Sequence, residues 1–490
     1  MHTQLSTWLA VSATMWPAVT AFYPYQHNDG STTTWSSRRN AKFSRRSSGS
    51  ITLPLRRVPV PLHSRQQNTY SIVDSKDPSQ ENSVAIDQDG SDLSYMVAVT
   101  IGDSKEEYRL LLDSAASNTW VMGQDCKSDA CGMHTTFGKG DSSSLKTQST
   151  PFSVTYGTGS ASGTLATDTL HIGSLSPTVS FGLATNVSDE FKSYPMDGIL
   201  GIGRGDTVSG SAQIMSSLLD AKLIGSKLYG IHLSRSKDGL NDGELNIGEV
   251  NKGRYSGDLN WLDCVPNDTG FWEISVADAS VDGKHIGLAG KTGIMDTGAS
   301  YILMPPADAL ALHSQIPGFA QSGETFSVPC DTKSALAFVF GKQSYNISTA
   351  DWLGGKLDSG LCRSNIVGRQ TFNESQWLIG DLFLKNVYSV FDFEDSRVGL
   401  GLPPTEGEKS SSSSSSTSPT ATSTAASSTA AASKSSGAAS ATQTAAVEGS
   451  ANPSSSAVAE SQGQGQKGVS ALVKAPLAFA IGAVLLSLLI

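Results

Sequence analysis

Two stretches of this chain repeat one another, and the repeat limits the folds open to it. Residues 109–117 read RLLLDSAAS and residues 292–300 read TGIMDTGAS, so each places an aspartate after an apolar run. An apolar-apolar-glycine signal follows each stretch and ends at Gly201 or Gly380. The spacing from aspartate to glycine is 88 residues in the first copy and 84 in the second. Paired signals at matched spacing predict a duplicated lobe of roughly 180 residues.

The repeat also predicts where the chemistry lies. Each copy ends its apolar run in a carboxylate, Asp113 or Asp296. An unpaired charge after a buried strand is costly. A pseudo-twofold axis that sets the two carboxylates side by side lets them share a proton. A single Asp-Thr-Gly arises by chance in a modest fraction of chains this long, whereas two such motifs at matched spacing, each with an apolar-apolar-glycine signal downstream, strongly indicate a shared site.

Between residues 93 and 402 the pattern is mostly β. Short alternating runs are separated by Gly, Asp and Asn turns, for example at Tyr95–Ile101, Tyr108–Leu112, Phe152–Tyr156 and Tyr388–Phe393. Helical periodicity is clearest at Ala212–Leu223 and Pro306–Gln315. These patterns predict a mostly β body with minor helices.

The body resembles the pepsin-like aspartic proteases across residues 90–402. The resemblance is carried by LLLDSAASNTWV, VTYGTGSASG, MDGILGIG, GIMDTGAS and WLIGDLFLKNVYSVFDFEDSRVGLG. It implies a bilobal fold, in which two pseudo-symmetric β lobes flank a central cleft. We place the N-terminal catalytic lobe at residues 74–258 and the C-terminal lobe at residues 259–402.

The resemblance also implies roles for individual residues. Asp113 and Asp296 are the expected catalytic pair at the cleft floor. The expected substrate-binding flap has its tip at Tyr156, Gly157 and Thr158. Support is expected from Trp120 behind Tyr156, and from Ser114, Thr297 and Gly298 in the catalytic loops.

Two carboxyl groups suit amide hydrolysis. At about 3 Å apart they cannot both ionise, so one keeps its proton. The ionised partner takes a proton from a trapped water, and the protonated partner stabilises the developing oxyanion. This chemistry requires a peptide or protein substrate and no metal or organic cofactor. The histidines show no zinc-site spacing, and the net charge of −10 argues against a nucleic-acid partner.

The first motif departs from the family pattern. It reads Asp-Ser-Ala where Asp-Thr-Gly is usual, so Ser114 keeps the hydroxyl while Ala115 adds a methyl group. Ala116 and Ala299 stand where many members place a hydroxyl against the carboxylates. Because losing a donor to an anion raises its pKa, we expect a pH optimum nearer 5 than 2. The departure supports one alternative, a catalytically silent pepsin-fold surface or binding protein. A further alternative is an enzyme that processes only itself.

A secreted route would allow disulfides and N-glycans. The resemblance implies disulfides Cys126–Cys131 and Cys330–Cys362, which leaves Cys264 as an inert thiol. Candidate N-glycosylation sites are Asn186, Asn267, Asn346 and Asn373.

The two ends of the chain predict export through the secretory pathway and attachment to a membrane. Residues 1–21 fit a signal peptide, residues 403–470 a Ser/Thr/Ala-rich disordered stalk, and residues 471–490 a hydrophobic tail. Small residues, a polar spacer and this tail match a signal for a glycosylphosphatidylinositol (GPI) anchor, with Gly463 as the expected attachment residue. A tail-anchored span is the rival. We expect a monomer that travels the secretory pathway to the plasma membrane or cell wall.

Residues 22–73 form a basic leader. They carry eight Lys/Arg and one acid, a charge of +7, which leaves −17 on residues 74–490 because the first 21 residues are neutral. Such asymmetry favours contact between the leader and the body. Dibasic pairs, including Arg56-Arg57, offer cleavage points. We therefore expect a removable inhibitory propeptide.

Overall fold

The structure is a computed structural model that describes residues 68–78 and 80–404. The predicted signal peptide, the hydrophobic tail and Gly463 lie outside the described residues. So do the leader up to residue 67 and all of the stalk except residues 403 and 404. The last six residues of the predicted leader, 68–73, are described and lie against the body. Within the described ranges the protein is mostly strands, which confirms the predicted fold class.

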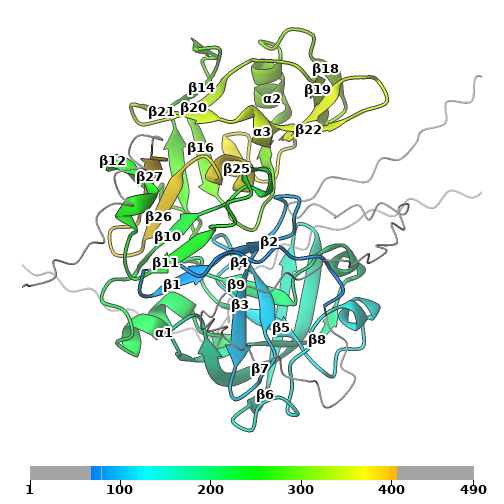
Figure 1. The fold of residues 1–490 in the computed structure, drawn as a ribbon, viewed down its shortest axis with the longest axis vertical. Helices are drawn as coiled ribbons and strands as arrows, with labels where there is room; N and C mark the ends of the chain where they lie inside the picture. Colours follow the sequence, from blue (N-terminus) through cyan, green and yellow to red (C-terminus); the bar gives the residue numbers. More distant parts are fainter. Residues whose placement is uncertain (1–67, 79, 405–490) are drawn as a thin grey trace, which may run out of the picture. The chain divides into compact units, whose positions relative to one another are not determined.

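An eight-stranded sheet dominates the N-terminal half, in blue and cyan at the bottom of Figure 1. In sheet order its strands are β2 (Asp87–Gln88), β3 (Tyr95–Ile101), β4 (Tyr108–Asp113), β9 (Gly198–Gly201), β5 (Trp120–Met122), β8 (Thr178–Val187), β7 (Gly159–His171) and β6 (Lys146–Tyr156). The long β6–β7 hairpin forms one edge of this sheet.

Three sheets build the C-terminal half, at the top of Figure 1. The first is β13 (Glu273–Val276), β16 (Lys291–Met295), β25 (Gln376–Ile379), β17 (Ile302–Met304) and β24 (Ile366–Gly368). The second is β15 (Lys284–His285), β14 (Asp278–Val281), β20 (Leu336–Phe340) and β21 (Gln343–Ile347), and the third is β18 (Ala320–Ser322), β19 (Thr325–Val328), β23 (Cys362–Ser364) and β22 (Leu353–Lys356).

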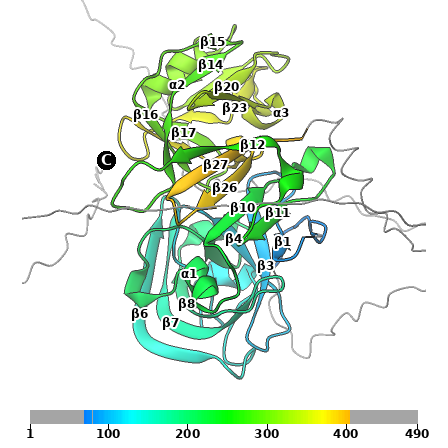
Figure 2. The same ribbon diagram turned by 90° about the vertical axis from the view of Figure 1, so that its left-hand side faces the viewer.

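A six-stranded sheet joins the halves and lies between them in both views (Figures 1 and 2). Its order is β1 (Ser83–Ala85), β11 (Glu244–Ile247), β10 (Leu228–His232), β26 (Tyr388–Asp392), β27 (Arg397–Leu402) and β12 (Ser256–Asp263). The predicted lobe boundary between residues 258 and 259 falls inside β12. Because β26 returns from the end of the body to pair with β10, the lobes share backbone hydrogen bonds as well as a linker.

The sequence repeat corresponds to a repeat of topology. In the first half β4 pairs in parallel with β9, with Leu112 opposite Leu200. In the second half β16 pairs in parallel with β25, with Met295 opposite Ile379. Each of β9 and β25 then pairs antiparallel with a further strand, β5 or β17. The apolar-apolar-glycine signals are therefore strands packed beside the strands that lead to the aspartates.

The glycine that ends each signal is required by a close approach of the backbone. A Cβ atom at Gly380 would lie 2.0 Å from the Ala299 carbonyl oxygen, and one at Gly201 would lie 2.6 Å from that of Asn118. No side chain fits at either distance. The strand beside each aspartate thus packs directly on the catalytic loop.

Helices are few and short in the described part of the chain. The α-helices are α1 (Ile214–Asp220), α2 (Pro306–His313), α3 (Thr349–Trp352) and α4 (Asp381–Leu384). The 3₁₀ turns are η1 (Asp129–Met133), η2 (Asp189–Ser193), η3 (Val208–Gly210), η4 (Ser236–Asp238) and η5 (Lys252–Arg254). Both expected helices are present, each shorter than its apolar pattern. None of the described helices is long and apolar enough to cross a lipid bilayer.

Candidate active site

The two aspartates occupy equivalent positions in the two halves. Asp113 is the last residue of β4, and Asp296 directly follows β16. Both side chains are nearly buried, at 4% and 7% exposure. Each is carried by a loop that leaves a buried strand, where the apolar run before it is held in the core.

Four hydrogen bonds cross between the catalytic loops and tie them together. Ser114 N–H donates to Thr297 Oγ1 at 3.0 Å, and Thr297 N–H donates to Ser114 Oγ at 3.0 Å. The Ser114 hydroxyl donates to the Met295 carbonyl at 2.9 Å, and the Thr297 hydroxyl to the Leu112 carbonyl at 2.8 Å. All these groups are buried, so the serine of the variant motif makes the same kind of contact as the threonine opposite it.

The two carboxylates accept different numbers of backbone hydrogen bonds. Asp113 Oδ1 accepts from the N–H groups of Ala115 and Ala116 at 2.9 and 2.8 Å. Asp296 Oδ1 accepts from the N–H of Gly298 at 2.8 Å. Because hydrogen bonds to a carboxylate favour its charged form, Asp113 is the better stabilised anion of the two.

Burial raises the pKa of both carboxyl groups. Desolvation raises the pKa of Asp113 to about 6, against the opposing effect of its two N–H donors. Desolvation and the charge of Asp113 raise the pKa of Asp296 well above its ordinary value. The two groups titrate as a pair. An arrangement in which one carboxyl is ionised and the other protonated is what water activation requires.

The glycine of the second motif is sterically required. A Cβ atom at Gly298 would lie 2.7 Å from Asp113 Cγ, so a methyl group there would displace the carboxylate. The corresponding residue of the first loop is Ala115, whose side chain is only half-buried and lines the cleft. The structure therefore accommodates the methyl group that the variant motif adds.

The predicted flap is the β6–β7 hairpin. At the end of this hairpin Tyr156 pairs with Gly159, so Gly157 and Thr158 form the tip of the hairpin. Trp120 Nε1–H donates to the Tyr156 hydroxyl at 2.8 Å, which is the support expected for that side chain. Tyr156 and Gly157 line a cleft of about 550 Å³ together with Asp113, Asp296 and Gly298. The cleft thus brings the predicted catalytic pair and the predicted flap together.

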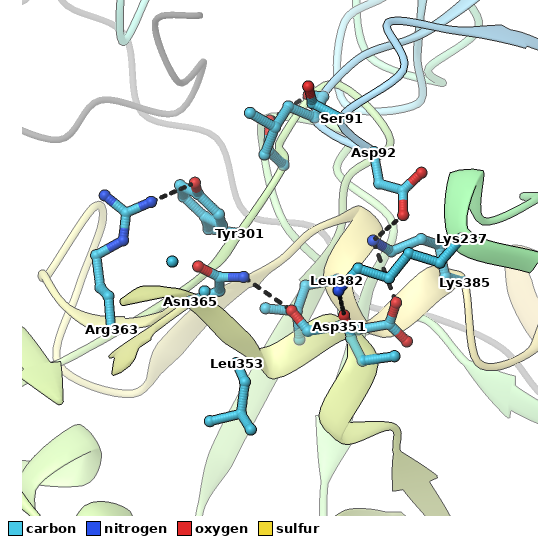
Figure 3. A pocket seen from close by; sticks show the side chains of 15 residues that line it. Ser91, Asp92, Lys237, Tyr301, Asp351, Leu353, Arg363, Asn365, Leu382 and Lys385 are labelled. Atoms are coloured by element: carbon cyan, nitrogen blue, oxygen red, sulfur yellow. Dashed lines mark hydrogen bonds and ion pairs between the residues drawn. The ribbon is translucent and has the colours of Figure 1, made fainter. Parts of the chain in front are cut away.

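A second, polar pocket has a volume of about 310 Å³. Ser300, four residues beyond Asp296 in the sequence, is one of the residues that line it. Figure 3 shows Lys385 between Asp92 and Asp351, and Arg363 beside the Tyr301 hydroxyl. Its two carboxylates are already engaged by Lys385, whereas the catalytic pair lines the larger cleft. The described ranges contain no group of three or more His, Cys, Asp or Glu arranged to hold a metal ion.

The structure contains both expected disulfides, Cys126–Cys131 and Cys330–Cys362. Cys264 is a free thiol whose pKa burial raises to about 11, so it is poorly suited to act as a nucleophile.

The four sequons lie in different environments. Asn186, Asn346 and Asn373 are exposed. Asn267 is half-buried, and its Nδ2 donates to the carbonyls of Val265 and Phe271 at 3.0 and 3.1 Å. A glycosylated amide keeps one hydrogen and cannot make both bonds.

Two features of the site were not apparent from the sequence. Asp381, the first residue of α4, is another buried carboxyl group that interacts electrostatically with Asp296, and desolvation raises its pKa well above the ordinary value. Phe191, in η2, packs edge-on against Trp120 with ring centroids 5.4 Å apart. Asp381 stands in a stretch quoted for the resemblance, but its burial depends on packing. No local signal marks Phe191.

Known proteins are similar to this chain over most of its length. The sequence pattern of "Eukaryotic aspartyl protease" matches residues 94–402. The "Probable aspartic-type endopeptidase CTSD" of Arthroderma benhamiae is 42% identical over 364 residues, which cover 74% of this chain and 71% of that relative. The "Aspartic-type endopeptidase ctsD" of Aspergillus fumigatus is 40% identical over 353 residues, 71% of this chain and 73% of that relative. "Pepsin A" of Sus scrofa is 30% identical over 318 residues, 63% of this chain and 81% of that relative.

The chain belongs to the eukaryotic aspartyl protease family. It is an aspartic-type endopeptidase with the two-lobed pepsin-like fold, as the sequence motifs predicted.

Proposed function

We propose that this endopeptidase hydrolyses peptide bonds with a water molecule activated between Asp113 and Asp296, and that it is made as a zymogen and tethered to the cell surface. The observation that carries the catalytic part is the set of four crosswise hydrogen bonds between the two loops. These bonds hold two buried carboxyl groups in one cleft. Such preorganisation is the main contribution a protein makes to this chemistry.

The proton inventory assigns a role to each carboxyl group. Asp113 accepts two backbone N–H groups and carries the negative charge, so it takes the proton from water. Asp296 accepts one and keeps the shared proton, so it donates a hydrogen bond to the scissile carbonyl oxygen. Water attacks the carbonyl carbon, and the proton held by Asp113 then passes to the leaving nitrogen as the C–N bond breaks.

The flap closes over the bound peptide. Tyr156 and Gly157 of the flap line the same cleft, and the Tyr156 hydroxyl accepts a hydrogen bond from Trp120. An extended substrate fits between the lobes and adds main-chain hydrogen bonds, as strands do at a sheet edge. Closure excludes water other than the reacting molecule.

The catalytic part is tested by isosteric substitution. Asp296→Asn should abolish pepstatin-sensitive cleavage of a peptide library, whereas Asp358→Asn, which changes an exposed carboxylate, should leave the rate unchanged. A folded wild-type enzyme that cleaves no library peptide would favour the silent binding protein. Removal of the leader with no other cleavage would favour self-processing alone.

The zymogen part rests on charge. The leader carries +7 and the rest of the chain beyond it −17, so the leader can cover an acidic cleft at neutral pH. Acidification protonates carboxylates and weakens the attraction. The unprocessed form should therefore cleave substrate far more slowly than the processed form at pH 6.5. Equal rates would contradict an inhibitory leader.

The tether rests on the tail signal, residues 471–490 after a Ser/Thr/Ala-rich stalk. Deletion of the tail should release active enzyme into the medium. Phosphatidylinositol-specific phospholipase C should release the intact chain from membranes. Release by the deletion but not by the phospholipase would favour a tail-anchored span instead.

A further inference from the structure

The end of the predicted leader is built into the N-terminal lobe. Thr69 N–H donates to the Met133 carbonyl at 3.1 Å, and Val73 exchanges two backbone hydrogen bonds with Gln88, at 2.8 and 3.1 Å. Ile72 packs against the same hydrophobic cluster as Tyr156 of the flap. Below, the strap means Asn68–Val73. The strap is therefore hydrogen-bonded to the N-terminal lobe through its backbone, and it packs through Ile72 on the hydrophobic cluster that Tyr156 also contacts.

Two strap side chains close over a buried polar pair. His134 and Asp197 are 0% and 1% exposed, with Nδ1 and Oδ1 3.5 Å apart. Asn68 Nδ2–H donates to Asp197 Oδ1 at 3.1 Å. The Tyr70 ring stacks on the His134 ring with centroids 5.3 Å apart. Without the strap, this pair would lose a hydrogen-bond donor and its cover.

The contacts continue from Tyr70 to the flap. The Tyr70 hydroxyl donates to the Lys192 carbonyl in η2, and His134 Nε2 is hydrogen-bonded to the Phe191 carbonyl at 3.0 Å in the same turn. Phe191 packs edge-on against Trp120, which donates to the Tyr156 hydroxyl.

A second set of contacts joins η2 to the flap through the backbone. Ser188, the residue before η2, donates its N–H to the Ser160 carbonyl at 2.9 Å. Its hydroxyl accepts from Ser160 N–H at 2.9 Å. Ser160 is the second residue of β7, the returning strand of the flap. Movement of η2 therefore moves the base of the flap tip.

We propose that the strap is a permanent part of the mature enzyme, and that Tyr70 is a positioning residue that sets the flap through η2. The proposal rests on the peptidase activity, and not on the leader's inhibition or the anchor. It requires the mature chain to begin at or before Asn68, whereas the leader predicted from the sequence extends to residue 73. Tyr70 contacts neither the catalytic carboxylates nor the cleft, so it acts only through the residues it holds.

Terminal sequencing and kinetics test the proposal in the full chain. The secreted mature enzyme should begin at or before Asn68. Tyr70→Ala should lower kcat/KM about tenfold, mainly by raising KM, because the flap binds the peptide. Thr69→Ala is the matched control, since Thr69 is exposed, its backbone hydrogen bond survives, and the substitution removes only a long 3.4 Å hydroxyl contact with the Met133 carbonyl. Tyr70→Phe keeps the ring stacked on His134 and loses the hydrogen bond to the Lys192 carbonyl, so it should lower kcat/KM by less than Tyr70→Ala does. It replaces Tyr70→Ala in the test if that variant does not fold.

Hydrogen–deuterium exchange separates positioning from general destabilisation. In the inactive Asp113→Asn background, Tyr70→Ala or Tyr70→Phe should speed exchange in the flap and η2 relative to Thr69→Ala. Exchange in the β26–β27 hairpin should not change. A fully active enzyme that begins after residue 73, or unchanged flap exchange with unchanged kcat/KM, would overturn the proposal. Because this measurement needs no catalysis, its result is independent of whether the catalytic assignment holds.

Discussion

Replacing one catalytic carboxylate should stabilise the protein at neutral pH while it abolishes activity. Burial raises the pKa of Asp113 from 3.8 to about 6. A raised pKa means that the folded state holds the protonated form more tightly than the unfolded state does. The stability from Asp113 is thus fully present below about pH 4 and is lost as the pH rises through about 6.

The magnitude follows from the size of that shift. A shift of about two pK units at roughly 1.4 kcal/mol per unit gives about 3 kcal/mol of stability lost by pH 7. Asp113→Asn has the same shape and does not titrate, and its Oδ1 can still accept from Ala115 and Ala116. At about 2 °C per kcal/mol for a body of this size, the variant should gain about 6 °C in Tm over the wild type at pH 7.

Fluorescence-monitored thermal unfolding at pH 4 and pH 7 measures the effect, with rapid scans to limit self-digestion of the wild type. The gain in Tm should be near zero at pH 4, where the wild-type carboxyl is protonated. Asp358→Asn, at an exposed carboxylate, should show no comparable change between the two pH values. A gain for Asp113→Asn that is the same at both pH values would refute the assignment of Asp113 as a buried carboxyl with a raised pKa.

Three further predictions concern the same structure. Ser114→Ala removes two of the four crosswise bonds and leaves the Met295 carbonyl and the Thr297 N–H without those partners. It should therefore lower the free energy of unfolding, measured by urea denaturation, by about 2–4 kcal/mol. Ser114→Thr keeps the hydroxyl and should restore the stability. Ala116→Ser adds a hydroxyl donor near the carboxylate of Asp113, which lowers its pKa, so the optimum in a pH–rate profile should move toward lower pH; an upward shift would contradict this sign. Glycopeptide mass spectrometry should find glycan on Asn186, Asn346 and Asn373 but not on Asn267, whose amide nitrogen makes two backbone hydrogen bonds.

Much of the fold was predictable because the information is periodic and local. The run at Tyr95–Ile101 became β3 with the same bounds, since alternation of apolar residues reports directly on a half-buried strand. The expected helix at Ala212–Leu223 shortened to Ile214–Asp220, because end residues are decided by caps and neighbours rather than by periodicity. The sheet shared by the two halves was not predicted, because pairing between β10 and β26 joins residues more than 150 positions apart.

The site divides in the same way. Motif and spacing identified Asp113 and Asp296, because these residues are tied to short sequence signals that recur in both halves, whereas the flap was implied by the family resemblance. The tertiary structure was needed to show that the two carboxylates accept different numbers of backbone hydrogen bonds and that the Asn267 amide is hydrogen-bonded to backbone carbonyls. It was also needed to show that the Ala115 side chain fits in the cleft.

The amino-acid sequence alone therefore determined the class of chemistry and the duplicated plan, because a repeated motif is written in the order of residues. Only the tertiary structure showed which backbone groups hold each carboxylate and that residues 68–73 lie against the N-terminal lobe. Burial and hydrogen bonding are properties of the whole packed chain, and residues 68–73, which look like leader by charge and position, are held to the lobe by contacts with residues far along the sequence.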